Sequence, residues 1–193
     1  IGKVDYVCHM GSDMTIVNSA RVSFGKEVEK ISAKDKKLIK YLIKHRHTST
    51  LEHCTVTFRI KVPLYIRSQH HRHRTWSYNE ISRRYTEINL EFYEPKKFRT
   101  QHESNRQASN TDELINPMTK HHKIDLFSGE VGRTTISTDA MLIIKRHHER
   151  SLLLFSSLLE AGVCREQARG VLPQNLYTEY YATTNLNNLF KFI

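Results

Sequence analysis

The chain of 193 residues has few of the residues that build disulfide frameworks, zinc knuckles or glycine-rich phosphate loops. Its three cysteines, Cys8, Cys54 and Cys164, are odd in number and form no C-x-x-C pair, so neither a disulfide framework nor a zinc knuckle is expected. Among seven glycines, neither G-x-G-x-x-G nor G-x-x-x-x-G-K-[ST] occurs, which excludes a Rossmann or P-loop fingerprint. No apolar run approaches the roughly 20 residues of a membrane span. We therefore expect no membrane association and a reducing, cytoplasmic setting.

Positive charge is the main compositional bias of the chain. Lysine and arginine total 30 against 20 acidic residues, which gives a net charge of +10. Such a balance favours anionic partners, namely nucleic acid, nucleotides or phosphorylated cofactors. A basic surface that only aids solubility explains the same charge equally well.

Hydrophobic periodicity predicts a mixture of helices and few strands. Apolar and polar residues alternate as in strands at 3–8, 54–62 and 88–93. Three- and four-residue spacing predicts helices at 12–20, 32–45, 64–74, 141–159, 165–170 and 186–193, while 176–184 is a strand or a helix. The polar segment 96–138 is expected to be a long loop or insertion. The fold class is then α+β, with a mixed or antiparallel sheet flanked by helices in a single domain spanning 1–193.

The most informative segment is the polar string at 72–85, which lies between a predicted helix and a predicted strand. It carries four arginines, and only Trp76, Ile81 and Tyr85 offer much apolar surface. Guanidinium groups held by a rigid frame suit an anionic, hydrogen-bonding ligand. The alternative is a solvated loop whose arginines pair with Glu80, Glu87 and Glu91.

The histidines and cysteines allow other chemistry that we consider weaker. Paired histidines near helix ends do not predict converging metal ligands, so we expect no metal site. Cys8 and Cys54 are expected to be small core residues. Cys164 precedes a helix, which could lower its pKa, although a structural role is favoured.

The string R-H-R-x-x-S-x-N-E-x-S-x-R-Y at 72–85 resembles the signature of the flavin-dependent thymidylate synthases, the ThyX family. Segments at 20–24, 47–53, 91–93 and 162–178 are also similar to the family, so the resemblance covers most of the chain except 96–138. It implies conversion of dUMP to dTMP, with methylenetetrahydrofolate as carbon donor, NADPH as reductant and bound FAD. It further implies a homotetramer whose subunits share active sites. The chain is most similar to viral or bacterial members.

The resemblance also assigns roles to individual residues. FAD is expected to contact His47, Ser49, Glu52, Arg72, His73, Arg74, Asn79 and Asn185. The nucleotide dUMP is expected to contact Gln69, Arg72, Glu80, Ile81, Ser82, Arg83, Arg84 and Arg169. Of these, Ser82, Arg84 and Arg169 are expected to act in catalysis, since a guanidinium stabilises the negative charge that builds on the pyrimidine oxygens. Ser82 could be a nucleophile or a nucleotide ligand, and we favour the ligand because no base lies beside it in the sequence.

Two departures from the family leave further functions open. Asn187 stands where relatives have arginine, and Lys191 stands where they commonly have asparagine. We expect a family segment that follows Ile193 to be missing from the sequence. The competing hypotheses are a nucleic-acid-binding protein, suggested by charge and interleaved aromatics, and a relative that binds nucleotide but has lost catalysis.

Overall fold

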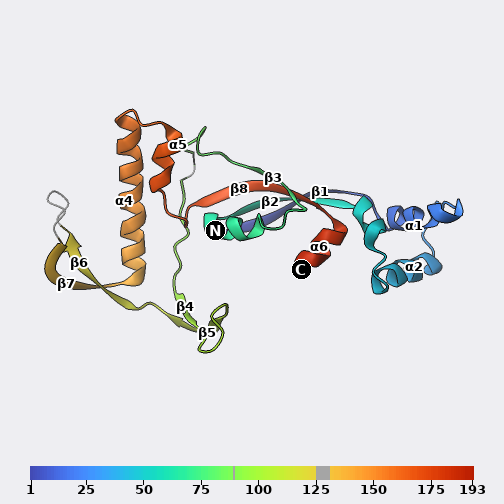
Figure 1. Ribbon diagram of the computed structural model, residues 1–193, viewed down its shortest axis with the longest axis horizontal. Helices are drawn as coiled ribbons and strands as arrows, with labels where there is room; N and C mark the ends of the chain where they lie inside the picture. The colour runs from blue at the N-terminus through green and yellow to red at the C-terminus, as the bar shows by residue number, and fades with distance from the viewer. Residues whose placement is uncertain (89, 125–130) are drawn as a thin grey trace. The chain divides into compact units, whose positions relative to one another are not determined.

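The computed structural model describes residues 1–88, 90–124 and 131–193. It divides into two compact units, one formed by Ile1–Ser82 with Tyr177–Ile193 and the other by Arg83–Leu176 (Figure 1). The expectation of a single catalytic domain over residues 1–193 stays a prediction.

The first unit is built on a four-stranded sheet in the order β1-β2-β8-β3 (Figure 1). Its strands are β1 (Lys3–Met10), β2 (Thr55–Pro63), β8 (Tyr177–Asn185) and β3 (Ser77–Glu80). All three neighbouring pairs are antiparallel, and Ile60 of β2 lies opposite Tyr180 of β8. These two residues form a buried cluster with Trp76 and Ala182. The α+β class with an antiparallel sheet is thereby confirmed, and the segment that could be strand or helix is a strand.

Among the described residues, six helical segments belong to the same unit, and some of them contribute to a second buried cluster. They are α1 (Asp13–Arg21), η1 (Val22–Phe24), α2 (Ala33–Lys44), η2 (Thr48–His53), α3 (Leu64–His70) and α6 (Leu186–Phe192). The predicted capping box is present at the start of α2, where the Ser32 side chain accepts from the Asp35 N–H. The second cluster contains Ile16, Leu42 and Leu51 with Cys54. It joins α1 and α2 to the residues that precede β2.

The second unit contains two hairpins in place of the predicted polar loop at 96–138. The first pairs β4 (Phe98–Gln101) with β5 (Ser109–Ile115), and the second pairs β6 (Met118–Ile124) with β7 (Val131–Asp139). Residues 125–130 lie outside the described part of the chain. Both hairpins form through backbone pairing, and β7 contains three threonines, a residue type enriched in strands. Because polar residues occupy both faces, the alternation that reveals a half-buried strand is missing from the sequence.

The strand predicted at 88–93 is not formed by the described residues of this segment. A single bridge pairs Phe92 with Leu176, and Asn89 lies outside the described residues. The Phe92 ring instead stacks on His148 of the helix α4 (Ala140–Glu160), with ring centroids 4.5 Å apart. Packing against a helix therefore replaces pairing with a strand.

The remaining helices of this unit follow the sequence closely. They are α4 (Ala140–Glu160), α5 (Arg165–Ala168) and η3 (Arg169–Val171). Asp139 caps the start of α4 by accepting from the Leu142 N–H, and Gly162 adopts a φ of 86° beyond its end. Within the residues that the structure describes, no helix combines the length and the apolar character that crossing a membrane requires.

Candidate active site

The basic signature begins on a turn between α3 and β3. Pro63 is the N-cap of α3, and the helix ends at His70 rather than at Arg74 as the sequence predicts. The His73 N–H then donates to the His70 carbonyl at 3.0 Å, which closes a turn. The side chains of Arg72, His73 and Arg74 are exposed on it. Ending the helix early thus places three cationic or hydrogen-bonding groups next to one another on a short turn.

The side chain of Tyr78 on β3 is hydrogen-bonded to the backbone of this turn. Its hydroxyl donates to the carbonyl oxygens of His70 at 2.9 Å and of His73 at 3.1 Å. The His71 ring stacks on the Tyr78 ring with centroids 4.0 Å apart. Burial raises the pKa of the Tyr78 hydroxyl, so it stays protonated and able to donate at neutral pH. One side chain therefore connects the end of α3 to the far side of the turn.

A buried histidine anchors the same turn to the core. His70 Nδ1 and the Tyr180 hydroxyl form a hydrogen bond of 2.8 Å, and the Trp76 ring meets the His70 ring edge-on at 4.7 Å. Burial lowers the pKa of His70 to about 4, so the ring is neutral at physiological pH. A neutral ring can be packed among aromatics without an uncompensated charge. The residue at the end of α3, from which the turn begins, is therefore packed among buried aromatic side chains.

The donors on the turn suit a phosphate-bearing ligand. The guanidinium groups of Arg72 and Arg74 are planar and present several N–H donors. The His73 ring packs edge-on against the Phe192 ring, with centroids 4.9 Å apart. Guanidinium groups at an exposed turn can donate several charge-assisted hydrogen bonds to one pyrophosphate. This donor set fits the anionic part of the FAD that the family resemblance implies.

Besides Arg72, the first unit carries four more of the residues predicted to contact the nucleotide. Glu80 ends β3, where its Oε1 accepts from the Thr178 hydroxyl at 2.5 Å and lies 3.1 Å from Arg67 Nε. The other three are Gln69 and Ile81, both exposed, and Ser82, which is half-buried. Gln69 lies on α3, and the other three lie at or directly after the end of β3.

Further predicted flavin contacts lie on η2, β3 and α6. Those at η2 are His47, Ser49 and Glu52, all exposed. Glu52 Oε1 accepts a hydrogen bond of 2.9 Å from Nδ2 of the buried Asn187. Asn187, which stands where relatives have arginine, therefore has a hydrogen-bond partner within the chain. Asn185 is the N-cap of α6 and accepts from the Asn188 N–H at 2.9 Å. Asn79 is exposed on β3.

The remaining predicted residues belong to the second unit, where two of them contact the same glutamate. Arg84 Nε lies 3.9 Å from the Glu166 carboxylate, and Arg169 Nε donates to the Glu166 backbone carbonyl at 3.3 Å. Arg83 donates through Nη1 to the Ile88 carbonyl at 2.5 Å, and burial lowers the pKa of its guanidinium. Arg84 and Arg169 therefore both contact Glu166, one at its carboxylate and the other at its backbone.

The alternative reading of the arginines as partners of nearby glutamates fails for two of the three carboxylates. Glu80 pairs with Arg67, and Glu87 pairs with Arg165 at 2.8 Å. Neither partner belongs to the basic string that begins at Arg72.

The cysteines and histidines do not supply a second reactive centre. Cys54 is buried as expected, and burial raises the pKa of its thiol, which disfavours the nucleophilic thiolate. Cys8 is exposed because it lies on the edge strand β1. The prediction that it is a core residue is therefore wrong. Cys164 is exposed at the N-cap of α5. Across the described residues, no group of three or more histidine, cysteine, aspartate or glutamate side chains could hold a metal ion.

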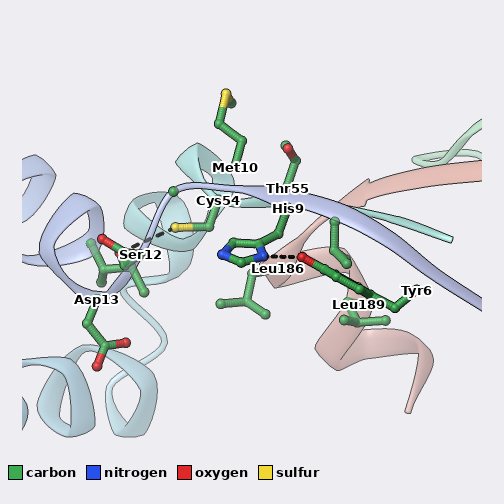
Figure 2. Close-up of a pocket in the computed structure, with 12 residues that line it drawn as sticks. Tyr6, His9, Met10, Ser12, Asp13, Cys54, Thr55, Leu186 and Leu189 are labelled. Carbon is green, nitrogen blue, oxygen red and sulfur yellow. Dashed lines mark hydrogen bonds between the residues drawn. The ribbon is translucent and has the colours of Figure 1, made fainter.

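A mostly apolar cavity of about 360 Å³ also lies in the first unit. Figure 2 shows it between β1, the start of α1, the start of β2 and α6, with Tyr6 and His9 hydrogen-bonded at 2.5 Å. In the described chain, none of the residues predicted for FAD or dUMP lines it. The cavity and the basic turn are separate features of this unit.

Sequence reasoning missed three residues that support the candidate site. Tyr78 occupies a variable position of the signature, and Thr178 ends a segment that is similar to the family. Both residues thus lie in segments that resemble the family, but the resemblance does not indicate which groups they contact. Arg67 lies in α3 without any sequence signal, since its contact with Glu80 depends on where the helix packs.

Comparison with known proteins identifies the family to which the chain is similar. A family model described as thymidylate synthase complementing protein matches residues 5–193. The flavin-dependent thymidylate synthase of Thermus thermophilus is 40% identical over 192 residues, which are 100% of this chain and 63% of the relative. That of Wolbachia pipientis is 36% identical over 192 residues, which are 100% of this chain and 61% of the relative. That of Thermosipho africanus is 38% identical over 184 residues, covering 95% of this chain and 72% of the relative.

Solved structures of related proteins agree with these matches. The UMP/dUMP methylase PolB from Streptomyces cacaoi bound with 5-Br UMP has a TM-score of 0.73 and 29% identity, covering 100% of this chain and 75% of that chain. The same methylase bound with 5-Br dUMP has a TM-score of 0.71 and 31% identity, covering 100% and 76%.

The chain spans less than two thirds of the Thermus and Wolbachia relatives, at 63% and 61% of their lengths. The match to the family model nevertheless extends over nearly all of its residues. The chain belongs to the thymidylate synthase complementing protein family, that of the flavin-dependent thymidylate synthases.

Proposed function

We propose that this chain carries the FAD- and dUMP-binding part of a flavin-dependent thymidylate synthase. The enzyme converts dUMP to dTMP, with methylenetetrahydrofolate as carbon donor and NADPH as reductant. The observation that carries the proposal is the exposed Arg72–Arg74 turn, fastened by Tyr78, in a chain of this family. The PolB structures bound to brominated UMP and dUMP support a pyrimidine nucleotide as the substrate.

The FAD would be held by donors from three parts of the first unit. Arg72, His73 and Arg74 would bind its phosphates, and Asn79 and Asn185 lie on the adjoining β3 and at the end of β8. The residues of η2 that would approach the flavin, within the same chain or from another subunit, are His47, Ser49 and Glu52. When bound, FAD supplies the hydride chemistry, and the protein supplies orientation and electrostatics.

The nucleotide would be bound by the residues that the family resemblance assigns to it. These are Gln69, Arg72, Glu80, Ile81, Ser82, Arg83, Arg84 and Arg169. Arg84 and Arg169 would stabilise negative charge on the pyrimidine oxygens during methylation at C5, and their common neighbour Glu166 supports a joint role. Ser82 would bind the nucleotide, and Ser82→Ala should weaken dUMP binding. Loss of turnover with unchanged dUMP affinity would instead make Ser82 a reacting group.

A homotetramer in the cytoplasm is part of the same proposal. Val4, Tyr6 and Met10 of β1 are 63%, 59% and 62% exposed, and β1 is an edge strand. An apolar edge of this kind is favourable when another subunit covers it. The three free cysteines suit a reducing compartment.

The proposal is tested by adding FAD to the purified protein and following NADPH oxidation by absorbance, with and without dUMP. Oxidation that requires FAD and is stimulated by dUMP is expected, followed by dTMP formation when the folate is present. Absence of flavin binding and of oxidation contradicts the proposal. Steeply salt-dependent binding of single-stranded RNA by such a protein would favour the nucleic-acid-binding alternative.

A further inference from the structure

Glu80 occupies a defined position at the end of β3. It lies opposite Tyr180 on β8, and its side chain is 24% exposed. Residues two apart on a strand point to the same face, so Thr178 lies diagonally across from Glu80 beside Tyr180. Thr178 is 4% exposed, and its hydroxyl donates to Glu80 Oε1 at 2.5 Å. A buried hydroxyl therefore ends directly on one oxygen of this carboxylate.

Arg67 reaches the same oxygen from α3. Its Nε lies 3.1 Å from Glu80 Oε1, and its side chain is 30% exposed. The Nε atom itself is buried, and no described group forms an aligned hydrogen bond with it. The contact is thus an ion pair by distance, which balances the charge of Glu80 and restricts where its carboxylate can turn.

Both contacts fall on Oε1, which leaves the second carboxylate oxygen for other partners. Among the described residues, the hydrogen bond from Thr178 is made to Oε1 and none is made to Oε2 of Glu80. We propose that Thr178 and Arg67 are positioning residues that hold Oε1 of Glu80, so that Oε2 faces a hydrogen-bond donor of the bound pyrimidine nucleotide. The inference rests on the proposed function and assigns two residues that the signature does not contain.

The chemistry of the substrate explains why such positioning matters. The terminal torsion of a glutamate is broad, so an unrestrained carboxylate samples many orientations. Fixing one oxygen removes this freedom before the nucleotide binds. The positive charge of Arg67 also offsets repulsion between the Glu80 carboxylate and the phosphate of dUMP.

The test compares two substitutions at Thr178 in the full chain loaded with FAD. Thr178→Val keeps the branched shape and removes the hydroxyl, while Thr178→Ser keeps the hydroxyl. We expect Thr178→Val to weaken dUMP binding by about tenfold, and Thr178→Ser to bind within about twofold of wild type. Arg67→Met should weaken dUMP binding in the same direction. Binding is measured by calorimetry with dUMP, and KM and kcat are measured separately.

Thr183 of β8 provides the matched control. Its hydroxyl bonds to the Thr57 hydroxyl at 2.9 Å, away from Glu80. Thr183→Val removes a partly buried hydroxyl contact from the same strand and should leave dUMP affinity unchanged. FAD binding and the thermal midpoint are recorded for all variants, so that a loss of folding is recognised.

The outcomes separate this inference from the proposed function. Failure of the wild-type protein to bind dUMP contradicts both. If the wild type binds dUMP and folded Thr178→Val binds it equally well, positioning by Thr178 is wrong while the proposed function stands. Equal weakening by Thr183→Val and Thr178→Val also overturns the inference, because the effect is then a general one on the strand.

Discussion

The buried His70 predicts that the first unit loses stability in mild acid. His70 is 9% exposed and bonds to Tyr180, which is 2% exposed. Its pKa falls from the ordinary 6.5 to about 4, with burial as the largest cause and the neighbouring His71 and His73 adding to it. The folded protein therefore holds a neutral ring at a pH where the unfolded chain already binds a proton. The contribution is fully present above the unfolded pKa of 6.5 and is lost as pH falls toward about 4.

The expected magnitude follows from proton linkage. With the pKa at 6.5 in the unfolded chain and about 4 in the folded one, the free energy of unfolding falls by about 2 kcal/mol between roughly pH 7 and pH 5. The double variant His70→Phe/Tyr180→Phe removes the titrating ring together with its buried hydroxyl partner. Removing both avoids leaving an unpaired polar group.

Urea unfolding at a series of pH values, at one protein concentration, measures the effect. The double variant should lose about 2 kcal/mol less than wild type over this pH interval. The single variant Tyr180→Phe retains the buried ring and should keep the wild-type direction of the pH dependence. Identical pH dependence for the wild type and the double variant would refute the reasoning.

Three further predictions follow from local contacts. Tyr78→Phe keeps the ring stack but loses the donor to the turn, and should weaken FAD binding by roughly fivefold in a flavin absorbance titration; an unchanged affinity contradicts the role of the turn. Gly11→Ala should lower the free energy of unfolding by at least about 1 kcal/mol in urea titrations, because Gly11 has a φ of 86° and an added Cβ would lie 2.7 Å from Cys54 Sγ. Hydrogen bonds from Ser32 hold the pKa of Asp35 below its ordinary 3.8, so that its stabilisation is present above this value and lost below it. Asp35→Asn should flatten the acid-unfolding curve, and an unaltered curve contradicts this assignment.

The secondary structure was predictable wherever one face of an element is buried. The alternation in β2 and the helical spacing in α4 both correspond to elements of the structure. The hairpins formed by β4 with β5 and by β6 with β7 were missed because polar residues alternate with no clear apolar face in their sequences. The helix expected to continue to Arg74 ends at His70, since the hydroxyl of Tyr78 on another element takes up the carbonyls of the turn.

Exposure of single residues was less predictable than element type. Cys8 lies in a short apolar segment, which suggested a core position, yet it is exposed on the edge strand β1. A period of two identifies the two faces of a strand but not which of them another element covers.

By itself, the sequence determined the types of most elements, the antiparallel α+β class and the family, because periodicity and the spacing of the signature are local properties of the chain. Only the tertiary structure decided which side chains meet. Glu80 contacts Thr178 across 98 positions, and Glu52 contacts Asn187 across 135. Such pairs depend on strand register and on where helices end, which are set by long-range packing and burial rather than by neighbouring residues.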